Sequence, residues 1–224
     1  MTAPMQKALV RIACDEVEVE GMLELPATPI GIVLFAHGSG SSRLSPRNNY
    51  VASILRGARM GTLLMDLLTP QEDQAYQTRF NIALLTLRLR TAAAWLRQHS
   101  DTRALPLGLF GASTGAAAAL QLCAQPDVAI AAVVSRGGRP DMAGPQMLQQ
   151  VRTPTLLIVG GLDEVVIGLN RDAFALLSCD KQIVIVPGAT HLFEEPGKLE
   201  IVAGLAKDWF ATRMGMPALH AADN

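Results

Sequence analysis

The sequence is poor in cysteine, in aromatic residues and in net charge. Its three cysteines, Cys14, Cys123 and Cys179, are an odd number without close spacing, which indicates neither a disulfide framework nor a metal site. Cys123 is expected to be a buried, unreactive thiol. Aromatic residues make up 4% of the chain and the formal net charge is −1. Such a balance does not favour nucleic-acid binding through global charge.

Long apolar segments are also missing. The N-terminus, residues 1–7, lacks the apolar core of a signal peptide, and no apolar stretch is long enough to span a bilayer. Together with the cysteine pattern, these absences predict a cytoplasmic protein without a membrane or nucleic-acid partner. The sequence carries no signal for the oligomeric state.

Aliphatic residues dominate the half of the chain that is apolar. Short continuous apolar runs are typical of strands buried on both faces, and they occur at residues 32–35, 62–65, 107–110, 130–134, 155–159 and 183–186. Helical candidates lie near 46–58, 73–99, 114–125, 144–150, 167–178 and 198–213. This alternation predicts an α/β fold with a mostly parallel sheet.

Two segments depart from that pattern. Residues 17–25 alternate between apolar and polar, which predicts an antiparallel edge strand with one wet face. The second segment, residues 79–98, is expected to be an amphipathic helix. Its solvated face is expected to carry the arginines that lie among its leucines: Arg79, Arg88, Arg90 and Arg97. We expect one domain over residues 1–213 and a loosely ordered tail over residues 214–224.

A Gly-x-Ser-x-Gly motif spans residues 111–115, between a predicted strand and a predicted helix. In that context the motif is typical of the nucleophile elbow, which exposes a serine hydroxyl on a strained turn. The glycines are needed because side chains there collide with neighbouring backbone. The sequence therefore predicts Ser113 as a nucleophile.

A serine hydroxyl needs a base, and a histidine base needs a partner that fixes its tautomer. Asp163 and His191 each follow a separate predicted strand and come after Ser113 in the chain order that an α/β-hydrolase requires. Because the carboxyl ends of parallel strands meet at one sheet edge, we expect the three to lie together. Asp141 and Asp66, which follow other strands, are alternative acids.

The negative charge that develops on a substrate oxygen needs donors that are already in place. The backbone N–H of Thr114, just after the nucleophile, is expected to be one donor. The second is expected from the loop after the first apolar run, where Ser39 is the best position. His37 precedes Ser113 in the chain and fits this oxyanion loop better than the role of base.

These residues resemble the α/β-hydrolase superfamily over nearly the whole chain, and the small size is similar to its dienelactone-hydrolase-like branch. The segments 37–43, 135–141 and 188–193 add to the resemblance. It implies a twisted, mostly parallel sheet with antiparallel N-terminal strands and no large lid. It also implies acyl transfer on a small ester or lactone, without a metal or organic cofactor. Dienelactone hydrolases use a cysteine nucleophile, whereas this chain has Ser113.

Four arginines lie in or near loops at the predicted carboxyl edge of the sheet: Arg43, Arg47, Arg136 and Arg139. One hypothesis is that they bind a carboxylate or phosphate of the substrate. The alternative, which we favour, is that they tie loops to backbone carbonyls and acidic side chains.

Two other functions are compatible with parts of the sequence. Residues 38–43 nearly match a dinucleotide-binding glycine motif, and Asp66 ends the next strand, as in an NAD-dependent oxidoreductase. Arg43 occupies the place of the third glycine, however. The other alternative is a ligand-binding protein that keeps the hydrolase fold and turns over slowly.

Overall fold

An eight-stranded sheet runs through the computed structural model, which describes residues 5–215. The strand order is β1-β2-β4-β3-β5-β6-β7-β8, and every pair from β4 to β8 is parallel, whereas β1–β2 and β2–β4 are antiparallel. The strands are β1 Gln6–Cys14, β2 Val17–Leu25, β3 Gly31–Ala36, β4 Met60–Met65, β5 Leu107–Ala112, β6 Ala132–Arg136, β7 Thr155–Gly160 and β8 Lys181–Val186. The predicted α/β-hydrolase fold is confirmed.

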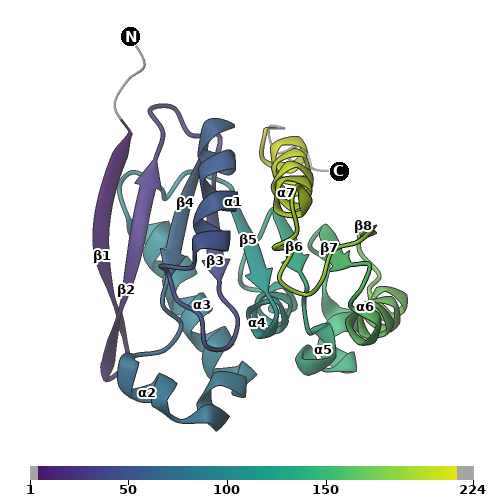
Figure 1. Ribbon diagram of the computed structural model, residues 1–224. Coiled ribbons are helices and arrows are strands. Elements are labelled where there is room, and N and C mark those ends of the chain that lie inside the picture. The colour runs from purple at the N-terminus through teal and green to yellow at the C-terminus, as the bar shows by residue number, and fades with distance from the viewer. Residues whose placement is uncertain (1–4, 216–224) are drawn as a thin grey trace, which may run out of the picture.

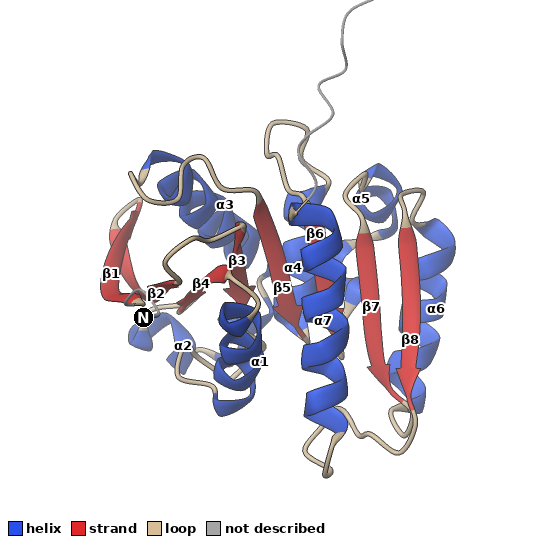
Figure 2. Cartoon of the chain, turned by 90° about the horizontal axis from the view of Figure 1, so that it is seen from above, coloured by secondary structure: helices blue, strands red, loops and turns tan. Residues whose placement is uncertain are grey.

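Helices cover both faces of the sheet (Figures 1 and 2). The α-helices are α1 Pro46–Gly57, α2 Pro70–Gln74, α3 Ile82–Gln98, α4 Thr114–Cys123, α5 Pro145–Gln150, α6 Glu164–Leu176 and α7 Lys198–Met214. Buried residues of α1 and α7 pack on one face, and those of α3, α4, α5 and α6 pack on the other. The core strands are buried on both faces, which explains their continuous apolar sequences.

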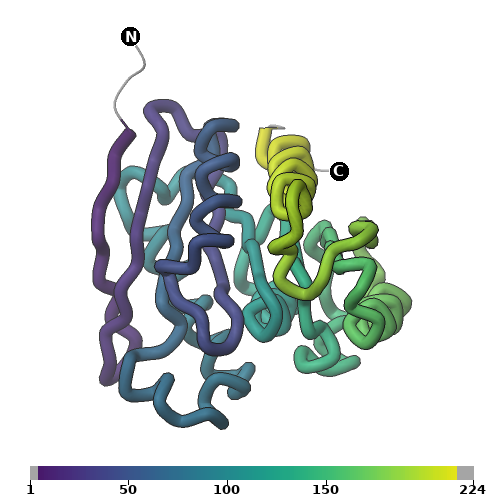
Figure 3. Tube along the Cα trace, viewed as in Figure 1, coloured from purple at the N-terminus to yellow at the C-terminus, as the bar shows by residue number. Residues whose placement is uncertain are grey.

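The prediction of an edge strand at residues 17–25 is wrong. β2 pairs with β1 on one side and β4 on the other, so β1 forms the edge. Figure 3 shows this pair at one end of the sheet. The alternation in β2 is real, since Val19, Gly21 and Leu23 are buried and Glu18 is exposed. The alternation indicates that one face of the strand is partly exposed to solvent. It does not indicate how many strands lie beside it.

The helix predicted over residues 73–99 is divided into three pieces. α2 begins at a capping box in which Thr69 and Glu72 bond each other's backbone N–H groups, a 3₁₀ helix follows at η1 Tyr76–Phe80, and α3 begins after Asn81. The Asn81 side chain accepts a hydrogen bond from Leu84 N at 3.1 Å. A new N-cap inside the apolar pattern therefore starts a separate helix.

The predicted solvated face is wrong at Arg88. This side chain is buried, donates to the carbonyl of Cys14 at 2.9 Å and pairs with Glu72 at 2.7 Å, so it ties α3 to β1 and α2. Arg90 and Arg97 remain exposed. A buried guanidinium with two partners is a structural cross-link, and the two stretches that it joins are far apart in the sequence.

Several element boundaries also differ from the prediction. β6 begins at Ala132 where the apolar run begins at Ile130, and α6 spans Glu164–Leu176 where 167–178 was expected. Helix α7 includes Met214, a buried residue that the sequence assigned to the tail. The rest of that predicted tail, from residue 216 on, lies outside the described residues. The segment between β6 and β7 holds only the 3₁₀ helix η2 Pro140–Ala143 and α5.

All three cysteines are free thiols, and Cys14 and Cys123 are buried. Burial raises the pKa of the Cys123 thiol to about 12, which keeps it protonated and unreactive. In residues 5–215 no three or more His, Cys, Asp or Glu side chains are placed to hold a metal ion. None of the helices in that range is both long and apolar enough to cross a membrane.

The sheet places several loops at one edge. In the register, Ala36 is beside Gly111, Ala112 is beside Arg136, and Gly160 is beside Val186. The parallel strands β3, β5, β6, β7 and β8 therefore end at similar heights. The loops that follow them meet where a site is expected in an open parallel sheet.

Candidate active site

The turn between β5 and α4 holds Ser113 in a strained conformation. Ser113 has φ 51° and ψ −120°, a backbone region that L-residues rarely adopt. A Cβ on Gly111 would lie 2.4 Å from the Cα of Ala116, and a Cβ on Gly115 would lie 2.3 Å from the carbonyl oxygen of Ala36. The two glycines of the motif thus allow α4 to pack directly on β5 and β3, and the turn between them has the geometry of a nucleophile elbow.

Asp163 and His191 are in direct contact. His191 Nδ1 lies 2.6 Å from Asp163 Oδ2, although the two follow different strands, β7 and β8. Their loops are joined by a hydrogen bond from Leu162 N to Ala189 O at 2.9 Å. A carboxylate that accepts from Nδ1 fixes the tautomer in which Nε2 is free to accept a proton. This pair therefore has the arrangement of a base and its orienting acid.

The loop after β6 connects this pair to the elbow. The N–H of Ser113 donates to Arg136 O at 3.3 Å, and the next residue, Gly137, lies against His191. A Cβ on Gly137 would be 3.1 Å from His191 O and 3.5 Å from the ring. Gly137 has φ 51°, which suits glycine. Ser113 and His191 thus contact the same short segment. Their side chains form no hydrogen bond within the described residues.

Neither alternative acid contacts His191. Asp141 accepts two hydrogen bonds from Arg139, at 2.9 and 2.7 Å, and Asp66 accepts from the backbone N of Arg43 at 2.7 Å. Each carboxylate is therefore used to hold a loop. The structure brings Asp163 to the histidine and leaves the other two with arginines.

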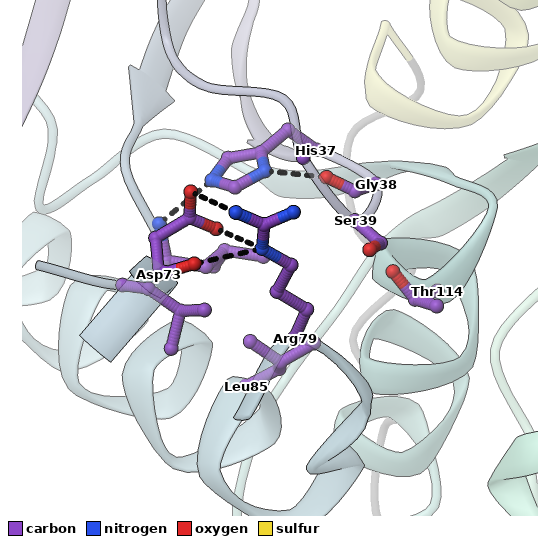
Figure 4. A pocket seen from close by; sticks show the side chains of 10 residues that line it. His37, Gly38, Ser39, Asp73, Arg79, Leu85 and Thr114 are labelled. Atoms are coloured by element: carbon purple, nitrogen blue, oxygen red, sulfur yellow. Dashed lines mark hydrogen bonds and ion pairs between the residues drawn. The ribbon is translucent and has the colours of Figure 1, made fainter. Parts of the chain in front are cut away.

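His37 fixes the loop after β3, which the sequence predicts as the oxyanion loop. Its Nδ1 donates to Gly38 O and its Nε2 accepts from Leu67 N, both at 2.9 Å, which defines a neutral ring. A Cβ on Gly38 would lie 3.0 Å from the Cβ of Ser113, so this loop touches the elbow. Thr114 is buried and Ser39 is exposed, and Figure 4 shows both at the same side of a pocket.

The buried His37 predicts an acid-sensitive fold. Desolvation lowers its pKa from the ordinary 6.5, so the unfolded chain binds this proton more tightly than the folded one. The stabilisation is complete above pH about 6.5 and is lost as the pH falls towards the folded pKa, by at most about 1.4 kcal/mol per pH unit. Urea unfolding between pH 7 and 5 should show this slope. It should be reduced in His37→Asn and kept in His99→Asn; an equal slope in the two variants would contradict the assignment.

Three of the four loop arginines form ion pairs: Arg43 with Asp66 and Glu20, Arg47 with Glu194, and Arg139 with Asp141. Their charges are used within the protein: the pairs of Arg43 and Arg47 join loops at the sheet edge to other segments, and the pair of Arg139 with Asp141 lies within one loop. This arrangement supports the structural alternative that the sequence favoured.

Arg136 is the exception, because no carboxylate forms an ion pair with it among the described residues. Burial and the nearby charge of Arg47 lower its pKa to about 10. Its Nη1 donates to Leu192 O at 3.4 Å, and its guanidinium lies 6.0 Å from the centre of the Phe193 ring. Arg136 thus holds the segment that follows His191.

Sequence reasoning missed Asn170. This fully buried side chain on α6 donates to Gly138 O at 2.9 Å and to Val166 O at 2.8 Å, and so anchors the loop after β6. The available signal was an asparagine within a helix, where it is seldom favourable. That signal does not identify the partner.

Comparison with known proteins decides the family. No protein-family model matches the sequence. The crystal structure of dienelactone hydrolase from Anabaena variabilis is 51% identical, with a TM-score of 0.90 over 93% of this chain and 98% of that chain. The chain belongs to the dienelactone hydrolase family. It is an α/β-hydrolase by family and by fold.

Other similarities are more distant or cover only part of the relative. Est1E from Butyrivibrio proteoclasticus has a TM-score of 0.79 at 14% identity, over 93% of this hydrolase and 99% of Est1E, and shares its fold. A Mycobacterium tuberculosis protein named "Putative phosphoribosyl transferase" is 54% identical over 214 residues. That match covers 96% of this hydrolase and 48% of the relative, so the chain spans about half the length of the curated relatives it matches.

Proposed function

We propose that this hydrolase cleaves small carboxylic esters or lactones through an acyl-enzyme on Ser113, with His191 as base and Asp163 as the acid that orients it. The observation that carries the proposal is the 2.6 Å contact between His191 Nδ1 and Asp163 Oδ2, beside the strained Ser113 turn. A strained serine and an oriented histidine at one sheet edge supply what acyl transfer requires.

The reaction proceeds in two steps. His191 Nε2 takes the proton of Ser113 as the serine oxygen attacks the carbonyl carbon. The tetrahedral intermediate collapses, the bond to the alkoxy oxygen breaks, and His191 gives the proton to that oxygen. Water, deprotonated by the same ring, then attacks the acyl carbon; the bond to the Ser113 oxygen breaks, the ring returns the proton to that oxygen, and the acid is released. In a lactone the alcohol remains part of the acyl chain and is released with it.

The intermediate's negative oxygen is bound in this proposal by the backbone N–H groups of Thr114 and Ser39. Thr114 is the first residue of α4, where the free N–H groups and the helix dipole favour negative charge. Ser39 belongs to the loop that His37 holds against the elbow. The four arginines are assigned to loop support, because the contacts described above occupy them.

The relatives' names are compatible with this assignment in part. The structural neighbours are named as a dienelactone hydrolase, a cold-adapted esterase and a dienelactone hydrolase-like promiscuous phosphotriesterase. The first two names fit an ester or lactone substrate. The transferase name belongs to chains about twice as long. For this chain, which matches about half of such a relative, we propose hydrolysis. The free thiols favour a reducing compartment, and we propose the cytoplasm.

A fluorophosphonate probe tests the nucleophile. Wild type should be labelled and Ser113→Ala should not, because only the activated serine attacks the phosphorus. Ser53→Ala, which removes an exposed hydroxyl on α1, should be labelled like wild type. Unlabelled wild type, or labelled Ser113→Ala, would overturn the proposal. A panel of short esters, lactones and thioesters then distinguishes an enzyme, which turns over, from a binding protein that only becomes labelled.

A further inference from the structure

A small pocket lies behind the proposed oxyanion loop (Figure 4). Its wall is formed by the segment 37–40, by Leu67 and Leu68, by Asp73, Arg79 and Leu85, and by Thr114 at the start of α4. About 10 Å³ of it is open, which is room for about one water molecule and too little for a substrate group. The charged side chains behind the loop, Asp73 and Arg79, therefore act on the loop and not on the substrate directly.

Arg79 carries the positive charge in the pocket wall, and Asp73 holds it from one side. Its Nε donates to Asp73 O at 2.8 Å, and its Nη2 donates to Asp73 Oδ2 at 3.0 Å. Asp73 belongs to the first turn of α2, which the Thr69–Glu72 capping box fixes. Two bonds from one guanidinium to one residue fix its plane as well as its position.

The free end of the guanidinium faces the oxyanion loop. Among the described residues Nη1 has no hydrogen-bond partner, and it lies 3.7 Å from the place a Cβ would take on Gly40. Gly40 has φ 67°, so the loop turns here in a conformation that suits glycine. In the view of Figure 4, Asp73 lies on one side of the guanidinium, with Ser39 and Thr114 on the other. The ion pair is therefore oriented with its positive end towards the loop.

A second group in the pocket lacks a partner. Thr114 is 2% exposed, and its Oγ1 is buried without a hydrogen bond in residues 5–215. The backbone N–H of the same residue is one of the two proposed oxyanion donors. The pocket thus brings a cationic donor, on a side chain that is 29% exposed, and a buried hydroxyl without a partner to the inner side of the proposed oxyanion hole, with space for one bridging water.

We propose that Arg79 is a positioning residue of the oxyanion hole. Its Nη1 supports the turn at residues 38–40, directly or through one water that also reaches Thr114 Oγ1. Its charge, oriented by Asp73, favours the negative oxygen on the other side of the loop. The Arg79 side chain is 29% exposed, so its charge is screened less than that of a fully exposed arginine. This inference rests on the proposed function.

The rate of phosphonylation by the fluorophosphonate probe measures this contribution without a known substrate, because negative charge develops on the phosphoryl oxygen. Arg79→Gln should react about tenfold more slowly than wild type, and Arg79→Lys should recover part of that loss because it keeps the charge. On an ester that wild type hydrolyses, kcat should fall by a similar factor with KM within about twofold. The control is Arg90→Gln, which removes an exposed arginine of α3 that forms an ion pair with Asp127, away from the pocket.

The possible outcomes are separable. Wild-type rates of labelling and kcat in Arg79→Gln overturn the inference and leave the proposed function intact. A change confined to KM or to thermal stability also overturns it, because a purely structural role predicts that result. Failure of wild type to become labelled overturns both. If Arg79→Gln does not fold, Arg79→Lys tests the inference: it keeps the charge but loses the two-bond clamp on Asp73, so labelling should be slower than in wild type, and wild-type rates would overturn the inference.

Discussion

Asp163→Asn is expected to lower kcat for ester hydrolysis by about 10⁴-fold while the protein remains folded. Asparagine is almost the same size, but it carries no charge to stabilise the imidazolium that forms at His191. Its amide also permits the wrong tautomer. The contact that it alters is the 2.6 Å bond between Asp163 Oδ2 and His191 Nδ1. Steady-state kinetics, with circular dichroism as the folding check, measure the effect.

Asp172→Asn provides the matched control, because it makes the same chemical change at an exposed position of α6. It should leave kcat unchanged. If Asp163→Asn kept more than a tenth of the wild-type rate, Asp163 would not be the orienting acid. Asp141 and Asp66 would then have to be tested in the same way, although their bonds to Arg139 and Arg43 predict mainly losses of stability.

Gly115→Ala is expected to have the largest effect on stability, about 3 kcal/mol, or a melting temperature lower by roughly 6–12 °C. The added Cβ would lie 2.3 Å from Ala36 O and 2.4 Å from His37 O. Both are backbone atoms, which cannot turn aside as a side chain does. The end of β3 and the oxyanion loop must therefore move, so kcat should fall together with stability. Thermal and urea unfolding measure the first effect, and ester hydrolysis measures the second.

Gly168→Ala is the control for this prediction. Gly168 lies inside α6, and nothing lies within 4 Å of the place where its Cβ would be. Alanine has the higher helix propensity, so this variant should be as stable as wild type or more stable, by up to about 1 kcal/mol. Equal losses in the two variants would show that the close packing of α4 on β3 is not what Gly115 provides.

The sequence predicted those parts of the molecule that depend on local patterns. Continuous apolar runs marked six of the strands because parallel strands are buried on both faces. The order of Ser113, Asp163 and His191 predicted a meeting at one sheet edge, and the structure brings Asp163 and His191 into contact. Their catalytic roles remain the proposal tested above.

The parts that the sequence did not predict depend on partners distant along the chain. Arg88 has the local pattern of a solvated helix face, and the carbonyl of Cys14 and the carboxylate of Glu72 make it a buried cross-link. Asn170 likewise gains its role from Gly138, and the role proposed for Arg79 depends on the segment 38–40. A polar residue whose partners lie far away in the sequence has no periodic signature, so its role is visible only once the chain is folded.

The distribution of the site along the chain also has a consequence for synthesis. The elbow around Ser113 is complete at the middle of the polypeptide, whereas His191 follows β8, and α7 must then pack near α1. A growing chain on the ribosome thus carries Ser113 without its proposed base until β8 and the loop with His191 have been translated. Non-local pairing of this kind is slow to form, because distant segments must first be brought together. Hydrolytic activity is therefore expected to appear late, as the C-terminal third joins the sheet.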